Sequence, residues 1–255
     1  MRGAALEPET HFHLSSGPSM NESPYLWPPR PVPSLRVKGR HERAPVNRIF
    51  CVGRNYHAHS VEMGRPVDKS GGRPFYFIKS PQALVETGAA IPYPPETTNL
   101  HHEMELVAVL GAAGFRVDPD RAHELIVGYA CGLDMTRRDL QFALRDKGLP
   151  WDVAKDFENA AIISEIAPMP GVALERGEIA LNVNGKVRQR SDLMKLIWSV
   201  RELIADLSLF YHLEPGDLIF TGTPEGVGPV EPGDRLEGRI AGVGEISLSI
   251  APSTR

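Results

Sequence analysis

Short apolar runs separated by turn residues recur along the chain from about residue 46 onwards. Runs of four to eight apolar or β-branched residues bounded by glycine, proline or asparagine are typical of β-strands. The pattern predicts strands over 49–52, 75–79, 103–110, 126–134, 179–183, 186–189 and 218–221. Asn184-Gly185 separates two of these runs and is a strong signal for a tight β-hairpin.

Helical segments are few and short. The spacing of polar and apolar residues predicts a helical turn over 55–63 and a charged helix over 136–147. Ser191 and Ser199 are both suited to cap a helix, and Glu202 follows Ser199 by three residues, as in a capping box. We therefore expect an α+β protein that is rich in mostly antiparallel strands and flanked by short helices, without regular βαβ units.

The first 45 residues differ from the rest of the chain because they contain eight prolines and few aliphatic residues. We expect residues 1–24 to form a disordered extension. Residues 25–45 mix prolines with aromatic side chains, which predicts an extended arm, because proline fixes φ and interrupts helices. The folded domain is expected over 46–255.

Composition narrows the classes of partner. The formal net charge of the 255 residues is −4 and no block of lysine or arginine stands out, so nucleic acid and an anionic membrane surface are not expected as partners. No apolar run approaches the ~20 residues that span a bilayer, and no secretory signal begins the chain, so we expect a cytoplasmic protein. Cys51 and Cys131 lie in apolar runs and are predicted to be reduced core residues.

Two glutamates stand two residues apart at the start of an apolar run. Glu103 and Glu105 would point to the same side of a strand, where like charges repel. A divalent cation with oxygen ligands would relieve that repulsion, although two such glutamates taken alone are more often a solvated acidic strand face. Asp134 ends another apolar run, and it either adds a third carboxylate or caps the helix that follows.

His59 and Glu62 are three residues apart in a predicted helical turn, which places them side by side. A carboxylate beside an imidazole fixes the tautomer and raises the basicity of the ring, as needed to activate water. The alternative is an ordinary surface pair, and His57 is a second candidate base.

Two further segments have features of an anion-binding site. Lys155 has apolar neighbours, so it either holds a carboxylate or oxyanion or extends its charge to the surface. The glycine-rich segment 221–229 either brings backbone N–H groups to an anion or forms a tight turn. A Walker loop, a dinucleotide-binding glycine motif and a Gly-x-Ser-x-Gly motif are all absent from the sequence, which disfavours nucleotide cofactors and serine-hydrolase chemistry.

The order of these motifs is more informative than any one of them. It resembles the fumarylacetoacetate hydrolase family over about residues 46–250. The matching motifs are Gly53-Arg54-Asn55-Tyr56, His59-x-x-Glu62, His102-Glu103-x-Glu105, Asp134-x-Thr136-x-Arg138-Asp139-x-Gln141, Lys155 and Thr221-Gly222-Thr223-Pro224. One departure is Lys79-Ser80-Pro81, where relatives often have lysine directly before proline.

The resemblance implies a β-rich roll of mixed sheets, generally homodimeric, and a role for each matching residue. It implies that Glu103, Glu105 and Asp134 bind Mg²⁺ or Mn²⁺. His59 and Glu62 would activate water from a short helix that closes over the substrate, and Lys155 would contact substrate oxygens. Arg138, Gln141 and Thr223 match positions that hold a ketoacid end.

The implied reaction is metal-dependent hydrolysis of the C–C bond of a 2,4-dioxo acid, in particular fumarylpyruvate to fumarate and pyruvate. An acylpyruvase or an oxaloacetate decarboxylase on the same scaffold is the enzymatic alternative. A catalytically silent metal-binding scaffold is the non-enzymatic one. Candidates for binding the distal carboxylate of such a substrate are Arg54, Arg65, Arg73 and Arg190.

Overall fold

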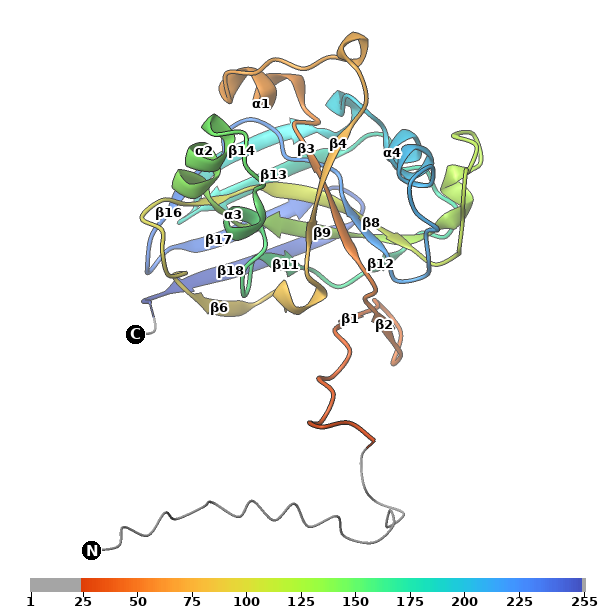
Figure 1. The fold of residues 1–255 in the computed structure, drawn as a ribbon, viewed down its shortest axis with the longest axis horizontal. Helices are drawn as coiled ribbons and strands as arrows, with labels where there is room; N and C mark the ends of the chain where they lie inside the picture. Colours follow the sequence, from red (N-terminus) through yellow and green to blue (C-terminus); the bar gives the residue numbers. More distant parts are fainter. Residues whose placement is uncertain (1–23, 254–255) are drawn as a thin grey trace, which may run out of the picture. The chain divides into compact units, whose positions relative to one another are not determined.

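The computed structural model describes residues 24–253 of the chain, which divides into two compact units, Met1–Pro31 and Val32–Arg255. Residues 24–31 are exposed and contain neither helix nor strand. The predicted disordered extension lies almost wholly outside the described residues, so it stays a prediction. All helices and strands of the described residues belong to the second unit (Figure 1).

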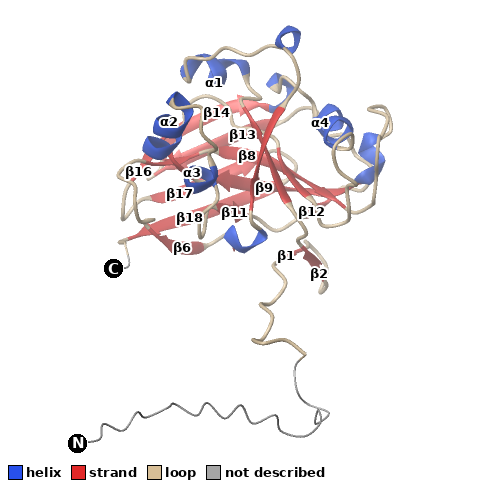
Figure 2. Cartoon of the chain, viewed as in Figure 1, coloured by secondary structure: helices blue, strands red, loops and turns tan. Residues whose placement is uncertain are grey.

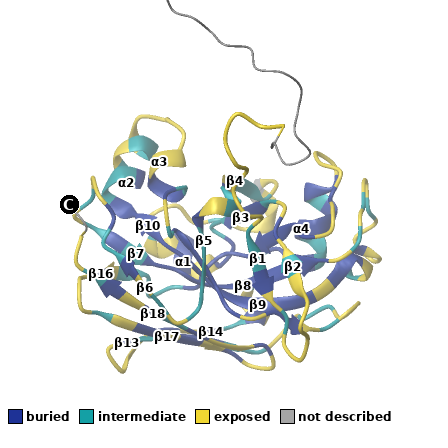
Figure 3. Cartoon of the chain, turned by 90° about the horizontal axis from the view of Figure 1, so that it is seen from below, coloured by how far each residue is buried: buried dark blue, intermediate teal, exposed yellow. Residues whose placement is uncertain are grey.

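The largest sheet of the second unit has eight strands. Their order is β4 (Phe75–Lys79), β3 (Ile49–Gly53), β15 (Leu218–Phe220), β8 (Met104–Leu110), β9 (Ile126–Asp134), β11 (Ala161–Ile163) and β5 (Leu84–Glu86), with β12 (Ala167–Pro168) also pairing with β9. Every residue of β8 is buried (Figure 3), because the strand is covered on both faces. That double burial explains its continuous apolar run.

A five-stranded sheet packs against β8 and β9. Its order is β14 (Lys186–Asp192), β13 (Glu178–Val183), β17 (Arg235–Ile240), β18 (Gly244–Ala251) and β6 (Ala89–Pro92). Buried and exposed residues alternate along β17, so one face meets the core and the other meets water. Gly238 permits the close approach of the two sheets, because a Cβ there would lie 2.6 Å from Met104 Sδ.

Two small sheets and several short helices complete the unit (Figure 2). The small sheets are β10 (Thr136–Arg137), β7 (Leu100–His102) and β16 (Gly228–Val230), and β1 (Ser34–Arg36) with β2 (Arg43–Pro45). The α-helices are α1 (His57–Glu62), α2 (Arg138–Asp146), α3 (Asp152–Lys155) and α4 (Val200–Leu207). The 3₁₀ turns are η1 (Lys69–Gly71), η2 (Pro81–Ala83), η3 (Ala122–Leu125) and η4 (Leu193–Lys195).

The predicted fold class is confirmed. Parallel pairing among the described strands is limited to β3 with β15, β5 with β11 and β6 with β18, and the remaining pairs are antiparallel. The predicted hairpin joins β13 to β14, with Asn184 and Gly185 both at positive φ, as a type I′ turn requires. Ser199 caps α4 and forms the predicted capping box with Glu202.

Three local predictions are wrong. Glu103 lies at a break between β7 and β8 and is not the first residue of a strand. The helix expected from residue 136 begins at Arg138, because Thr136 and Arg137 pair with β7. Ser191 pairs with Ile179 inside β14 and caps no helix, whereas the Asp192 side chain accepts from Met194 N and caps η4.

The second unit includes residues 32–45, which the proline spacing assigned to the arm. Leu35 is fully buried, and β1 and β2 form an antiparallel pair. Cys51 and Cys131 are free and buried, as expected. None of the helices within residues 24–253 has the length and apolar character needed to cross a membrane.

Candidate active site

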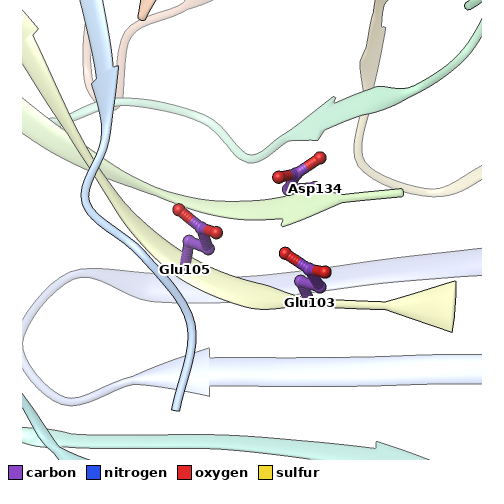
Figure 4. A group of neighbouring side chains, drawn as sticks. All are labelled: Glu103, Glu105 and Asp134. Carbon is purple, nitrogen blue, oxygen red and sulfur yellow. The ribbon is translucent and has the colours of Figure 1, made fainter. Parts of the chain in front are cut away.

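Glu103, Glu105 and Asp134 form a buried cluster, and one carboxylate oxygen of each lies within 4.8 Å of the other two (Figure 4). The pairing of β8 with β9 brings them together, because Met104 is in register with Leu133 and Asp134 N donates to Glu103 O at 2.9 Å. The three side chains therefore converge although 29 residues separate Glu105 from Asp134 along the chain.

Cations surround two of the three carboxylates. Lys155 Nζ donates to Glu103 Oε2 at 2.9 Å and to Asp134 Oδ2 at 2.7 Å. Arg138 forms an ion pair with Glu103, and Lys79 Nζ lies 2.8 Å from Asp134 Oδ1. Burial opposes ionisation of Glu103, but Lys155 and Arg138 outweigh it and hold the pKa of that carboxyl well below its usual range. The negative charges of Asp134 and Glu103 raise the pKa of Lys155 despite its burial.

Glu105 lacks such a partner. Within residues 24–253 no lysine or arginine pairs with it, and its carboxylate accepts from Gly222 N at 2.7 Å. Burial, together with the negative charges of Asp134 and Glu103, raises the pKa of Glu105 well above its ordinary value. Asp134 Oδ1 is also buried; the Lys79 ammonium lies 2.8 Å away, but no described donor makes a well-aligned hydrogen bond to it. Uncompensated charge and free oxygen lone pairs fit a hard divalent cation.

His59 and Glu62 form a pair on α1. His59 Nδ1 lies 3.3 Å from Glu62 Oε2, and Glu62 also accepts from Gly226 N at 3.2 Å. Partial burial would raise the pKa of Glu62, but the hydrogen bonds from His59 and Gly226 lower it. His59 is buried, whereas His57 is exposed and lies 3.1 Å from Val67 O through Nδ1. The structure therefore separates the two candidate bases.

A cavity brings the predicted residues to one place. Its lining includes His59, Glu103, Glu105, Arg138, Gln141, Lys155 and Thr223. Asp134 and Glu62 are not part of the lining, and each contacts a residue that is, Asp134 through Lys155 and Glu62 through His59. The residues that the family motifs assign to the metal, to the histidine–glutamate pair and to the ketoacid thus line or adjoin one cavity.

The donors in this cavity are already engaged with protein groups. The three N–H groups of the Lys155 ammonium point to Glu103, Asp134 and Thr136. Arg138 bonds to Gln141, its neighbour one helical turn away, as well as to Glu103. These contacts fix the side chains before any substrate binds.

Thr223 and His102 both contact the buried side-chain amide of Gln189. Gln189 donates to Thr223 Oγ1 at 2.8 Å and accepts from Met104 N at 3.0 Å. Thr223 in turn donates to Met104 O at 2.9 Å. His101 Nδ1 accepts from Arg138, and His102 Nδ1 lies 3.2 Å from Gln189 Oε1. Burial lowers the pKa of each histidine to about 4, so both are neutral at pH 7.

The sequence motifs did not indicate a role in the site for Gln189, Lys79 or Arg145. Gln189 alternates with exposed residues in β14, a pattern that marks an inward-facing polar side chain. Arg145 lines the cavity from α2, one helical turn beyond Gln141, and the spacing 138, 141, 145 would have indicated it. Lys79 ends the apolar strand β4, but only the fold shows that it reaches Asp134.

The four arginines considered for a distal carboxylate separate into two groups. Arg54 and Arg65 line the cavity. Arg73 instead pairs with Asp206 at 2.8 Å, and Arg190 lies 3.6 Å from Glu178 on the five-stranded sheet.

A β-rich body that holds three buried carboxylates beside a histidine–glutamate pair is characteristic of a divalent-metal-dependent enzyme. The family model described as fumarylacetoacetate (FAA) hydrolase C-terminal matches residues 48–251. The chain therefore belongs to the fumarylacetoacetate hydrolase family.

Relatives within this family are similar over most of the chain. A fumarylpyruvate hydrolase from Ralstonia sp is 63% identical over 191 residues, which are 75% of this chain and 100% of that protein. The mitochondrial oxaloacetate tautomerase FAHD1 from Arabidopsis thaliana is 40% identical over 204 residues, or 80% of this chain and 90% of that protein. The crystal structure of fumarylpyruvate hydrolase from Pseudomonas aeruginosa in complex with Mn²⁺ and pyruvate has a TM-score of 0.85 and 45% identity, covering 90% of this chain and 100% of that one.

Proposed function

We propose that this chain is a divalent-metal-dependent hydrolase that cleaves the C–C bond of fumarylpyruvate to give fumarate and pyruvate. The observation that carries the proposal is that the cluster of Glu103, Glu105 and Asp134 adjoins the same cavity as His59. Support comes from the fumarylpyruvate hydrolase at 63% identity and from the related structure that holds Mn²⁺ and pyruvate.

Glu103, Glu105 and Asp134 are the residues that would hold Mg²⁺ or Mn²⁺. Bound there, the cation would supply Lewis-acid polarisation of the ketoacid oxygens. Lys155 and Arg138 keep Glu103 ionised, and Lys155 also keeps a positive charge beside Asp134. These residues thus prepare oxygen ligands in their anionic form.

His59 acts as the general base in this proposal. Glu62 accepts a hydrogen bond from the Nδ1–H group of His59, which leaves Nε2 free to take a proton from water. The water oxygen then bonds to the carbonyl carbon beyond the central CH₂, and the C–C bond between that carbon and the CH₂ breaks. The CH₂ carbon leaves with the electron pair as the enolate of pyruvate and takes up the proton that His59 Nε2 removed from water. This regenerates neutral His59, and one water is consumed for each pair of products.

The ketoacid end of the substrate is assigned to Arg138, Gln141, Thr223 and Lys155. Arg138 and Lys155 add positive charge where the enolate develops. The hydroxyl proton of Thr223 points to Met104 O, so Thr223 donates to a ketoacid oxygen only after its hydroxyl rotates.

Turnover in the presence and absence of metal tests this function. The protein should consume fumarylpyruvate, as measured by the loss of its dioxo-acid absorbance. One pyruvate should form for each molecule of fumarylpyruvate consumed. EDTA should abolish the reaction, and adding back Mn²⁺ or Mg²⁺ in turn should restore it and show which ion is more effective. Failure to form pyruvate with either ion, or full activity in EDTA, would overturn the proposal.

Oxaloacetate tautomerisation is the second candidate, because relatives with that name are 37–40% identical to the chain. That reaction moves a proton and needs no attacking water. Supplying both substrates separates the two functions, since a tautomerase would convert oxaloacetate and leave fumarylpyruvate intact.

We also propose that the protein acts in aromatic catabolism, in the cytoplasm, as a homodimer. The two buried free thiols are consistent with a reducing compartment. Light scattering at several protein concentrations tests the dimer, and a constant monomer mass would refute it.

A further inference from the structure

Three arginines line the cavity in addition to the residues that face the carboxylate cluster. Arg54 follows β3, Arg65 follows α1, and Arg145 lies in α2. They come from three separate elements, so the fold gathers them in one place.

These guanidinium groups have few carboxylate partners. Within residues 24–253 neither Arg54 nor Arg65 takes part in an ion pair, and Arg145 pairs with the exposed Asp146 at 3.0 Å. Arg54 Nε is buried and donates to no described group. Burial, followed by the charges of Arg65 and Arg145, lowers the pKa of Arg54.

Arg54 is also held in a strained backbone. Its φ is 57°, in the left-handed region that most residues avoid. Strain and an unpaired buried donor persist where a site is preorganised for a ligand. A guanidinium group with free N–H donors matches a carboxylate in charge and in its planar two-point geometry.

A row of aromatic rings separates this arginine group from the carboxylate cluster. Lys155 Nζ lies 4.8 Å from the centre of the Phe77 ring, and the Arg54 guanidinium lies 5.4 Å from the centre of the Phe75 ring. The two phenylalanine rings are 6.4 Å apart. Phe77 and Trp151 line the cavity, so its wall is aromatic and apolar between the arginine group and the carboxylate cluster.

We propose that Arg54, assisted by Arg65 and Arg145, binds the terminal carboxylate of the substrate and so selects acylpyruvates that carry a carboxylate at the end remote from the ketoacid. This assignment rests on the proposed hydrolase function, since it places the ketoacid at Arg138 and the metal ligands. The apolar wall would then contact the planar unsaturated segment that joins the two ends.

Two substrates that differ at the far end provide the test. Fumarylpyruvate carries the terminal carboxylate, and acetylpyruvate has the same dioxo-acid head but ends in a methyl group. Arg54→Met should lower kcat/KM for fumarylpyruvate by about 10- to 100-fold, the usual effect of losing a hydrogen bond to a charged group. The same substitution should leave kcat/KM for acetylpyruvate within about twofold, and Arg54→Lys should restore part of the loss.

Arg190→Met is the matched control, because Arg190 lies outside the cavity on β14. It should change neither substrate's kinetics. Equal loss on both substrates in Arg54→Met would indicate a structural role and overturn the assignment. A wild-type protein that hydrolyses both substrates equally well would overturn the arginine assignment and leave the hydrolase function standing, whereas hydrolysis of neither would overturn the function itself.

Discussion

Asp134 and Glu105 carry the same charge in one cluster, but their surroundings differ. Asp134 lies between Lys79 and Lys155, at 2.8 and 2.7 Å. Glu105 accepts one backbone N–H, from Gly222, and its pKa is raised, so its charged form is disfavoured in the folded protein. An acid with a raised folded-state pKa contributes destabilisation above its unfolded pKa, and stability falls as pH rises.

Substitution of these two residues should therefore have opposite effects on metal-free protein at pH 7. In EDTA, Glu105→Gln replaces a buried acid, whose ionisation the fold disfavours, with a neutral amide and should stabilise the fold by about 1 kcal/mol, or ~2–4 °C in Tm. Asp134→Asn leaves the buried Lys79 without a carboxylate partner and Lys155 with Glu103 alone, and it should destabilise the fold by about 3–5 kcal/mol. Thermal unfolding of both variants beside wild type measures the difference. A loss of stability in Glu105→Gln equal to that in Asp134→Asn would contradict it.

The two histidines of α1 give a second contrast between residues. His59→Ala removes the base that faces the cavity and should lower kcat by about 10²–10⁴-fold while Mn²⁺ still binds. His57 is exposed and points to Val67 O, so His57→Ala should retain near-normal turnover. Steady-state kinetics together with Mn²⁺ titration of each variant distinguishes loss of the base from loss of metal. A His59→Ala variant with normal kcat would exclude His59 as the base.

Sequence motifs predicted most of the residues that line the cavity. A shared strand, however, does not explain why Glu103 and Glu105 point the same way. Glu103 and Glu105 converge without sharing a strand, because Glu103 sits at the break before β8. The choice between His57 and His59 depended on which ring the fold buries. Lys79 could not be assigned from the sequence because its partner Asp134 is 55 residues away.

Among the elements, the loop between β15 and β16 supplies N–H donors to the site. Gly222 donates to Glu105 and Gly226 donates to Glu62, so the anions that this glycine-rich loop approaches are carboxylates of the protein itself. Gly222 has a φ of +96°, and a Cβ there would lie 2.7 Å from Asn55 Cβ. Backbone conformation and close packing both require glycine at this position.

Gly222→Ala should consequently disturb the site as well as the fold. We expect a loss of about 1–3 kcal/mol in stability from overpacking and strain, together with weaker Mn²⁺ binding because relief of the clash with Asn55 displaces the residue 222 N–H from Glu105. Gly185→Ala is the control, since Gly185 has a φ of +74° with no neighbour within 4 Å of the added Cβ. Gly185→Ala should lower the stability through backbone strain and leave Mn²⁺ affinity unchanged, as measured by calorimetry. Equal Mn²⁺ affinity in the two variants would mean that Gly222 has no role in placing Glu105.

The predicted helix and strand bounds are accurate where a buried apolar run has clear limits in the sequence, and inaccurate where strand pairing decides the structure. Strands β4 and β9 match their predicted bounds because their apolar runs are bounded by breaks that the sequence shows. Thr136 and Ser191 suit helix starts by residue type, yet both pair within strands. Thr136 pairs with His101 of β7, which is remote in the sequence, whereas Ser191 pairs with Ile179 because the predicted hairpin extends further than its apolar pattern indicates. Strand pairing overrides local propensity in both cases.

At the scale of the whole molecule, the second compact unit begins at Val32, earlier than the start at residue 46 that the proline content indicates. Leu35 is fully buried, Arg36 and Arg43 both pair with Glu86, and Ile166 N donates to Arg36 O. Residues 32–45 thus contribute to the core unit, although their prolines resemble those of residues 24–31. Proline excludes helix in both segments but does not exclude strand pairing.

Two truncations test this boundary in the intact enzyme. Deleting residues 1–31 should leave Tm and kcat unchanged, because residues 24–31 are exposed and the unit from Val32 retains the described core. Deleting residues 1–45 removes Leu35 and the β1–β2 pair, and it should cost about 2–5 kcal/mol, as for loss of a buried leucine. Thermal unfolding and light scattering of both proteins separate stability from assembly. If the shorter deletion alone lowered the molecular mass without changing Tm, the arm would be a subunit contact; if both deletions left Tm unaltered, the folded domain would begin at Val46 after all.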